Sequence, residues 1–542
     1  MKKLTLNIIL TVALLITCGV YSYAQTHNPR LMVNIVVSSM HANDLVRYGD
    51  NFSNGGFNKL RNEGVWFTNA SYDYMQTSTP VSLATISTGA TPSIHGVVAD
   101  GWFDYVSNKK VMLINDEKEY SVNFSAGSGK YSPRQLTAQT LSDAVAEYND
   151  KSIIRTIAVE PVSAIVMAGH AGKAYWMETL QSAWTTTSYY GTELDPWIAE
   201  YNRNDMNEEF VSRKWTPLLK FDNYHNSQVV CMEGLKSDKN KQLHYIQNES
   251  IVLNSIVDDV YEQMCYSPAG NSAVLSFAKQ MIAKNSMGAD ENVDVLNIVL
   301  DSPRFISSRY GIESVEYEDM LYRLDRDLDE FFTFLLAQVT DSRDVVITLT
   351  SDHGTSPSYN NPGKEHGRFN VRQAEVITNA FIGSLHGNGE WVLGIVDNAV
   401  YLNHNLIYEK GLSIADVQYD VATFVMQLRG VAHALSAEAL RSSYFGSGYG
   451  RKVQNGFYPR RSGDVIINLM PGWIPEMENV RSWSGSMYQY DTHVPLLIYG
   501  AGAPAAKRSE KVFVTSLAAT QAQLLGISTP SAAEGEALTI FN

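Results

Sequence analysis

The sequence has few cysteines. Only three of its 542 residues are cysteine, and two of these, Cys231 and Cys265, follow the N-terminal segment. Two cysteines cannot form the disulfide framework of a domain of this size, which excludes the class of small disulfide-stapled folds. The sequence leaves open whether Cys231 and Cys265 pair in an oxidising compartment or stay as separate buried thiols.

Positive charge is also scarce. The chain has 42 lysine and arginine residues against 57 aspartate and glutamate residues, a formal net charge of −15. Binding to nucleic acid needs a basic face, so this balance argues against a nucleic-acid partner. It also predicts no electrostatic recruitment to anionic membranes.

Only one long apolar run is present, and it lies at the N-terminus. Two lysines precede the apolar stretch from Leu4 to Val20, and small residues, Ser22 and Ala24, occupy the two positions that a signal peptidase reads. Residues 1–24 are therefore predicted to be a signal peptide, and the mature protein to be periplasmic or extracellular without a transmembrane segment. A lipoprotein anchored at Cys18 is the less favoured alternative, because the residue before it is a poor match.

Buried-strand patterns recur along the mature chain. The clearest β-branched apolar runs are Leu31–Val37, Val293–Leu300 and Val345–Thr350. Such runs, alternating with helical periodicity, predict an α/β fold with a doubly wound, mostly parallel sheet flanked by helices. Residues 25–542 are expected to form one discontinuous domain, with inserted cap segments at about 178–292 and 355–460. The amphipathic segment from Leu324 to Phe332 predicts a helix whose acids, including Asp325, face solvent.

The run that ends at Thr350 is followed by chemistry-bearing residues. Asp352, His353 and Gly354 follow it after one residue, Ser351. Ligands of open α/β sheets bind beyond the carboxyl ends of the strands, and an aspartate beside a histidine offers the oxygen and nitrogen donors that suit Zn²⁺. Gly354 lets the backbone turn away at once. The alternative is a strand end that only caps the next element.

Thr79 belongs to a second candidate site, at the predicted start of a helix. It stands before Pro80 in a hydroxyl-rich stretch that turns into an apolar helical period, which is typical of a helix N-terminus and of anion binding there. Its hydroxyl is able to attack phosphorus if a metal lowers its pKa. The alternative is that Thr79 is simply the N-cap of the helix.

Two further candidates stand next to apolar runs. Asp301 follows the strand predicted over Val293–Leu300, and His493 stands at the head of the run that continues to Tyr499. A single histidine in such a place is more often a structural residue. These positions gain meaning only together with Asp352 and His353.

In order and type, these residues resemble the alkaline phosphatase superfamily. The likeness is closest to bacterial threonine-nucleophile alkaline phosphatases and to the type I phosphodiesterase/nucleotide pyrophosphatase relatives, and it spans nearly the whole mature chain. The motifs that carry it, besides Thr79 and Asp301, are Ser93-Ile94-His95-Gly96, Trp102-Phe103-Asp104, Ala168-Gly169-His170, Ser351-Asp352-His353-Gly354, Pro471-Gly472-Trp473 and Asp491-Thr492-His493-Val494-Pro495.

The resemblance implies a centre of two zinc ions that activates the attacking oxygen and stabilises the leaving one. Carried over to this chain, Asp301 and His493 belong to the first metal site. Asp352, His353 and the nucleophile Thr79 belong to the second.

Several positions depart from the family pattern. The resemblance implies a carboxylate at Ser38 and a histidine at Phe305, so each metal site loses one ligand. It implies an asparagine at Asp100, and a lysine and an arginine at Glu160 and Val162. An acid in place of a base opposes the binding of a phosphate dianion.

These departures favour a degenerate two-metal site, with weak or lost phosphate-ester hydrolysis and a binding or scaffold role. Zinc, as one ion or two, is then held weakly, because catalytic zinc usually has three protein ligands. The alternative is an active metal-dependent phosphodiesterase or phosphatase that uses Thr79, with His41, Glu160 or Asp100 replacing a lost ligand. Sulfatase chemistry is disfavoured, because no Cys-x-Pro-x-Arg sequence is present.

Overall fold

The structure of the protein is a computed structural model. The structure describes residues 28–122, 129–178, 183–204, 208–211, 215–230, 244–245, 264–339, 341–358 and 366–541. The expected signal peptide and Cys231 lie outside these residues, so the pairing of Cys231 with Cys265 stays untested. Cys265 is buried.

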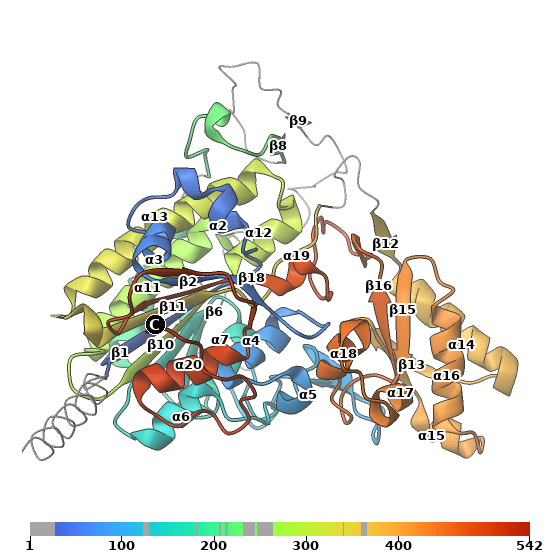
Figure 1. The fold of residues 1–542 in the computed structure, drawn as a ribbon. Coiled ribbons are helices and arrows are strands. Elements are labelled where there is room, and N and C mark those ends of the chain that lie inside the picture. The colour runs from blue at the N-terminus through green and yellow to red at the C-terminus, as the bar shows by residue number, and fades with distance from the viewer. Residues whose placement is uncertain are drawn as a thin grey trace, which may run out of the picture.

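A ten-stranded sheet forms the centre of the molecule (Figure 1). Along the sheet the strand order is β19-β2-β18-β11-β1-β10-β5-β6-β7, and β20 pairs with β2. The strands are β1 (Leu31–Val37), β2 (Val65–Ser71), β5 (Ile154–Ala158), β6 (Lys173–Glu178), β7 (Ala183–Thr185), β10 (Asp294–Leu300), β11 (Val345–Thr350), β18 (His493–Gly500), β19 (Ala506–Arg508) and β20 (Val512–Phe513).

The middle of this sheet is parallel, as the buried apolar runs predict. Strand β1 pairs in parallel with both β10 and β11, and β5 and β6 extend the parallel part on one side. Strand β18 runs antiparallel to β11. Because β1, β10 and β11 are parallel neighbours, the residues that follow them emerge at the same edge of the sheet.

The two faces of β1 bury different halves of the core. Leu31, Val33, Ile35 and Val37 belong to one apolar cluster, whereas Met32 and Val36 belong to the other. This period of two is the alternation of a strand covered on both faces. The first cluster includes residues of α3 (Phe57–Glu63), α11 (Pro268–Asn285), α12 (Ser302–Tyr310) and α13 (Val315–Ala337), and the second those of α4 (Thr79–Thr88), α6 (Leu141–Tyr148), α7 (Pro161–Ala168) and α20 (Ser516–Leu525).

The expectation that the acids of α13 face solvent is wrong for Asp325. Its side chain is buried, and it accepts hydrogen bonds from the backbone N–H groups of Ser53 (2.5 Å) and Phe57 (2.7 Å). Phe57 is the first residue of α3, so Asp325 satisfies donors at that helix start. The acid therefore joins α13 to α3 instead of facing solvent.

A second, smaller sheet lies beside the first (Figure 1). Its four antiparallel strands follow the order β13-β14-β16-β15 and carry their own apolar core with α14 and α16. The bounds are β13 (Val392–Val396), β14 (Ala399–Leu402), β15 (Val431–Ser436), β16 (Val465–Leu469), α14 (Val371–His386) and α16 (Ile414–Val425). The exact limits of the inserted segments stay a prediction.

The remaining elements are short. They are α2 (Asp44–Arg47), η1 (Gly49–Asn51), α5 (Pro92–His95), β3 (Gly101–Phe103), β4 (Lys110–Met112), α8 (Pro196–Arg203), α9 (Glu208–Val211), η3 (Phe221–Asn223), β8 (Gln228–Val229), β9 (His244–Tyr245), η4 (Ser342–Asp344), β12 (Gly367–Phe369), α15 (His404–Glu409), α17 (Ala437–Ser442), α18 (Gly448–Asn455), β17 (Trp473–Pro475) and α19 (Gln489–Thr492). None of the helices in the described ranges has the length and apolar character needed to cross a membrane.

Candidate functional site

The candidate site begins at the carboxyl ends of β1, β10 and β11. In the register of the sheet, Val37 of β1 lies opposite Leu300 of β10, and Val36 lies opposite Thr350 of β11. The next residues along the three strands therefore emerge together. Ser38, Asp301 and Asp352 are all fully buried there.

Asp352 is held by hydrogen bonds from the end of β1. The Ser38 hydroxyl donates to Oδ2 of Asp352 at 2.7 Å, and the backbone N–H of Ser39 donates to Oδ1 at 3.0 Å. The backbone N–H of His353 also donates to Oδ1, at 2.8 Å. Ser39 has a positive φ of 62°, a conformation rare for a residue with a side chain. Both carboxylate oxygens of Asp352 are thus engaged within the protein.

His353 connects Asp352 to Thr79. Its Nδ1 lies 2.6 Å from the carbonyl oxygen of Gly354, which can only accept, so Nδ1 carries a proton. Burial lowers the pKa of His353 and favours the neutral ring. Nε2 is then an acceptor, and the Thr79 hydroxyl donates to it at 3.1 Å. Nε2 also lies 3.3 Å from Oδ2 of Asp352.

Thr79 is the first residue of α4 and not its N-cap, which is Ser78. Pro80 follows at a position where a helix needs no N–H donor. Thr79 is 5% exposed, so this residue is almost completely covered by the protein. The arrangement pairs a hydroxyl with a neutral imidazole acceptor, which is the geometry of a nucleophile and a base.

The carboxylate of Asp301 accepts hydrogen bonds from the start of α7 and from the residues just before it. The backbone N–H groups of Val159 and Glu160 donate to its Oδ2 at 3.1 and 3.0 Å, and the Ser163 hydroxyl donates to Oδ1 at 2.7 Å. Burial raises the pKa of Asp301 to about 7, although Arg304 acts to lower it. The hydrogen bonds to both carboxylate oxygens of Asp301 therefore come from the protein itself.

His493 is placed apart from the chain of bonds that joins Ser38, Asp352, His353 and Thr79. Its Nε2 lies 2.9 Å from the carbonyl oxygen of Thr68 and donates to it. Its Nδ1 is buried and has no hydrogen-bond partner among the described residues. The ring packs edge-on against His41 with centroids 5.3 Å apart.

His41 is itself engaged. The backbone N–H of Asn43 donates to Nδ1 of His41 at 3.0 Å, so the ring already uses an acceptor. Burial, followed by the proximity of His493, lowers the pKa of His41 to about 4. The low pKa keeps the His41 ring neutral. Among the described residues, neither His41 nor His493 has a recorded hydrogen bond to Asp352 or Asp301.

The substituted positions have structural roles of their own. Phe305 on α12 packs against Tyr266, with ring centroids 5.2 Å apart. Val162 is partly buried and packs on the cluster that includes α4 and α7. Asp100 precedes β3 and Glu160 precedes α7, and both interact electrostatically with Arg304.

Arg304 is the functional candidate that sequence reasoning missed. It lies on α12, three residues after Asp301, and its Nη2 is 4.0 Å from Oδ1 of Asp301. Spacing of three residues at a helix start brings two side chains together, so that signal was present in the sequence. The other carboxylates around it come from distant segments, and no local pattern indicates them.

A small pocket opens beside this centre. It has a volume of about 160 Å³ and lies between the start of α4, the β13–β14 turn and the loop after β17. Ser484, one of its lining residues, has its hydroxyl 3.4 Å from Nε2 of His353. Asp397 of the turn also lines it, and burial, followed by repulsion from Asp100, raises the pKa of Asp397 to about 7.

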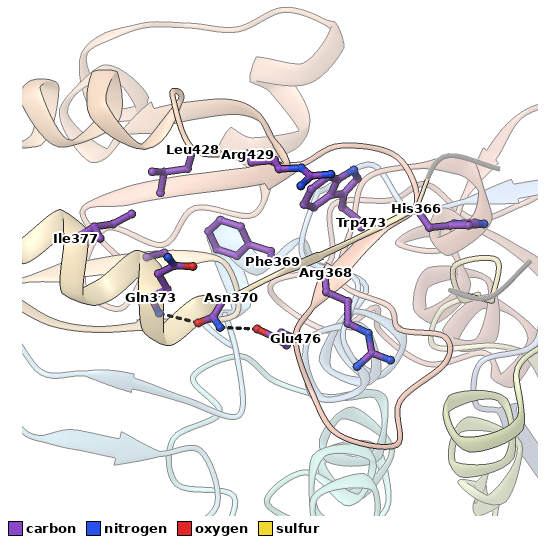
Figure 2. Close-up of a pocket in the computed structure, with 12 residues that line it drawn as sticks. His366, Arg368, Phe369, Asn370, Gln373, Ile377, Leu428, Arg429, Trp473 and Glu476 are labelled. Carbon is purple, nitrogen blue, oxygen red and sulfur yellow. Dashed lines mark hydrogen bonds between the residues drawn. The ribbon is translucent and has the colours of Figure 1, made fainter. Parts of the chain in front are cut away.

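A larger pocket of about 600 Å³ lies elsewhere (Figure 2). It is bounded by α14, β12 and the start of β17, with Phe369, Trp473 and Arg429 among its lining residues. None of the site residues expected from the sequence lines it. The smaller pocket is the one that adjoins the centre, through Ser78, the residue before Thr79, and through Ser484.

The donor set does not fit a two-zinc centre. Within the described ranges, no three side chains of His, Cys, Asp or Glu gather closely enough to hold a metal ion. Asp352 and His353 are two ligands, and the hydroxyls of Thr79 and Ser38 add no charge or imidazole nitrogen. Asp301 faces a guanidinium in place of a second imidazole.

Comparison with known proteins agrees with this architecture. The family model of type I phosphodiesterase/nucleotide pyrophosphatase matches residues 32–489. Alkaline phosphatase PafA of Elizabethkingia meningoseptica is 29% identical over 522 residues, with 94% of each chain covered. Alkaline phosphatase PhoV of Synechococcus elongatus is 26% identical over 515 residues, which cover 94% of this chain and 92% of that protein.

The crystal structure of wild-type alkaline phosphatase PafA has a TM-score of 0.87 to this structure at 28% identity, and the match covers 96% of this chain and 100% of that one. The similarity therefore extends over both sheets. The chain belongs to the type I phosphodiesterase/nucleotide pyrophosphatase family, and its fold is that of the alkaline phosphatase superfamily.

Proposed function

We propose that this is an exported member of the family whose hydrolysis of phosphate esters is weak or lost, and whose cleft serves a binding role. The observation that carries the proposal is the state of Asp301. Its oxygens accept bonds from two backbone N–H groups and from Ser163, and its nearest cation is Arg304. A carboxylate whose oxygens already accept hydrogen bonds from the protein gains little from binding a metal ion.

The charge around Thr79 supports the same proposal. Glu160, Asp352 and Asp100 all act electrostatically on Arg304, and Asp100 and Asp397 repel each other. A phosphate dianion brought to Thr79 would meet more carboxylates than cations. In a recess shielded from solvent this repulsion is stronger than in water.

A second candidate is an active hydrolase, and the Thr79–His353 pair is the observation that favours it. The Thr79 hydroxyl would attack a phosphodiester while Nε2 of His353 accepts the proton. The names of the similar proteins, alkaline phosphatases PafA and PhoV, agree with this candidate. A monoanionic diester suits the acidic recess better than a monoester dianion.

Two measurements on the purified mature protein separate the candidates. Zinc analysis after dialysis should give at most one ion per chain under the proposal, and close to two under a zinc-dependent enzyme. An activated aryl phosphodiester is then assayed with the parent chain and with Thr79→Ala. Equal low rates support the proposal, whereas a rate that disappears in Thr79→Ala overturns it. Thr79→Ser is the matched control, since it keeps the hydroxyl.

A further inference from the structure

We propose that Arg304 is the resident cation of this cleft, and that its guanidinium balances the carboxylates at the ends of β10 and β11 where a divalent metal would otherwise be needed. Arg304 is thus a positioning residue. The inference deepens the proposed function and rests on it, because both require a cleft without two zinc ions.

The position of Arg304 follows from the start of α12. Asp301 ends the β10 segment and is the residue before this helix, so Arg304 at the third helical position returns toward it. The distance from Nη2 to Oδ1 of Asp301 is 4.0 Å, and the side chain of Arg304 is 27% exposed against 0% for Asp301. The guanidinium therefore covers the buried carboxylate from the solvent side.

Four carboxylates from four separate segments act on this guanidinium. They are Asp301 after β10, Asp352 after β11, Glu160 before α7 and Asp100 before β3. Their attraction raises the pKa of Arg304 even though burial acts to lower it. Arg304 in turn acts to lower the pKa of both Asp301 and Asp100. The ion pair with Asp301 fixes the place of the guanidinium, and the other three carboxylates act on it electrostatically.

Such a cation has a physical reason to be there. Asp301 and Asp352 are both 0% exposed, and a buried carboxylate without a compensating charge is strongly unfavourable. A guanidinium stays charged, so at the 4.0 Å ion-pair distance from Asp301 it compensates that charge without a hydrogen bond. The same positive charge repels a metal cation that approaches these carboxylates.

Phe305 gives the guanidinium a second support. The Cζ atom of Arg304 lies 4.5 Å from the centre of the Phe305 ring, within the range of a cation–π contact. The family resemblance implies a metal-binding histidine at this position. Here the ring stacks beside the arginine, so the two neighbouring residues act together in place of an imidazole and its metal ion.

Zinc titration of the full mature chain tests the inference. Arg304→Met removes the charge and keeps most of the length, and Arg304→Lys keeps the charge. We expect Arg304→Met to bind zinc about tenfold or more tightly than the parent chain. Its melting temperature should fall by several degrees without metal and recover when zinc is added. Arg304→Lys should bind zinc as weakly as the parent.

Arg309→Met is the matched control, because Arg309 lies on the same helix but packs on Tyr266 and Tyr310. It should leave zinc affinity unchanged. The inference is overturned if Arg304→Met binds zinc no better than the parent, or if Arg309→Met shows the same gain.

Phe305→His is a second route that does not depend on the folding of Arg304→Met. With Arg304 present, Phe305→His should gain little zinc affinity. Phe305→His combined with Arg304→Lys should gain equally little, because the positive charge stays. Phe305→His combined with Arg304→Met should gain the most. Strong zinc binding by Phe305→His alone contradicts the inference.

The outcomes for Arg304 and for the proposed function are distinguishable. If hydrolysis that requires Thr79 is found while Arg304→Met still gains zinc, the proposed function fails and the role of Arg304 stands. If hydrolysis is absent and Arg304→Met gains no zinc, the proposed function stands and the role of Arg304 fails.

Discussion

The Ser38 hydroxyl lies 2.7 Å from Oδ2 of Asp352 and donates a hydrogen bond to it. The hydroxyl satisfies one carboxylate oxygen of Asp352 without adding a second negative charge. A second carboxylate in its place would repel Asp352 unless a cation lay between them. A carboxylate at position 38 would therefore need a metal ion between it and Asp352, whereas the serine present needs none.

We predict that Ser38→Asp makes the stability of the protein depend on metal. The two adjacent carboxylates should lower the melting temperature in the presence of a chelator, and added zinc should raise it above that of the parent chain treated in the same way. Thermal unfolding with and without zinc measures both effects. No response of Ser38→Asp to zinc would contradict the prediction.

Ser38→Ala is the control for this experiment. It removes the hydrogen bond to Asp352 without adding charge, and it should cost about 1–2 kcal/mol of unfolding free energy, since one acceptor loses its partner. Its melting temperature should not respond to zinc.

Asp301 should contribute to stability without any metal. We predict that Asp301→Ala costs about 3 kcal/mol, because the backbone N–H groups of Val159 and Glu160 lose a buried acceptor. Asp301→Asn keeps an acceptor oxygen for these groups and should cost clearly less. Denaturant unfolding in the presence of a chelator measures both variants. Equal stability of Asp301→Ala and the parent chain would show that the carboxylate has no such structural role.

The sequence was sufficient for the framework of the site. The apolar runs of β1, β10 and β11 are buried on both faces, and such runs can be recognised without knowledge of their neighbours. Because parallel strands end at one edge, Asp301 and Asp352 emerge at the same edge of the sheet. Both are buried, at the ends of the two strands that flank β1.

The partners of these acids could not be read from the sequence. Asp325 fits the polar face of its own helix, but its partner, the N–H of Phe57, is 268 residues away. The spacing along α12 indicates that Arg304 lies near Asp301, whereas its electrostatic interactions with Asp100 and Glu160 depend on how α7 and β3 pack. Periodicity describes one element at a time, so interactions between distant elements escape it.

The pH dependence of stability should contain a contribution from Asp44. Burial raises the pKa of this carboxyl from 3.8 to about 6, against the lowering effect of hydrogen bonds from Tyr317 and the backbone N–H of His41. Between these pH values the folded protein holds more protons than the unfolded chain. The contribution of Asp44 to the free energy of unfolding therefore falls as pH rises from about 4 to about 6.

Asp44→Asn removes this contribution and keeps an acceptor for both donors. Relative to the parent chain, we predict that the variant gains about 2–3 kcal/mol of unfolding free energy between pH 4 and pH 7. Denaturant unfolding of both proteins over this range gives the difference directly. A constant difference between the two curves would exclude the titration of Asp44 as its source.

Gly354 is needed because of a close approach between two chain segments. Its φ is not in the left-handed region, so the turn itself does not require glycine. A Cβ atom there would lie 2.1 Å from the carbonyl oxygen of Tyr490, and the Gly354 N–H donates to the carbonyl oxygen of Asp491 at 2.7 Å. The segment after β11 and the helix α19 are thus held in direct backbone contact beside His353.

We predict that Gly354→Ala forces these segments apart and costs roughly 3 kcal/mol or more, as expected when a side chain is placed in occupied space. Because Nδ1 of His353 donates to the carbonyl oxygen of Gly354, the shift should also disturb the His353–Thr79 pair. Gly383→Ala in α14 is the control, since its nearest neighbour is 4.0 Å away and alanine favours helix. Unfolding free energies and the NMR signals of the His353 ring measure the two effects. A Gly354→Ala protein as stable as Gly383→Ala would show that the loop can yield at this point, and the contact would then not be what fixes the imidazole beside Thr79.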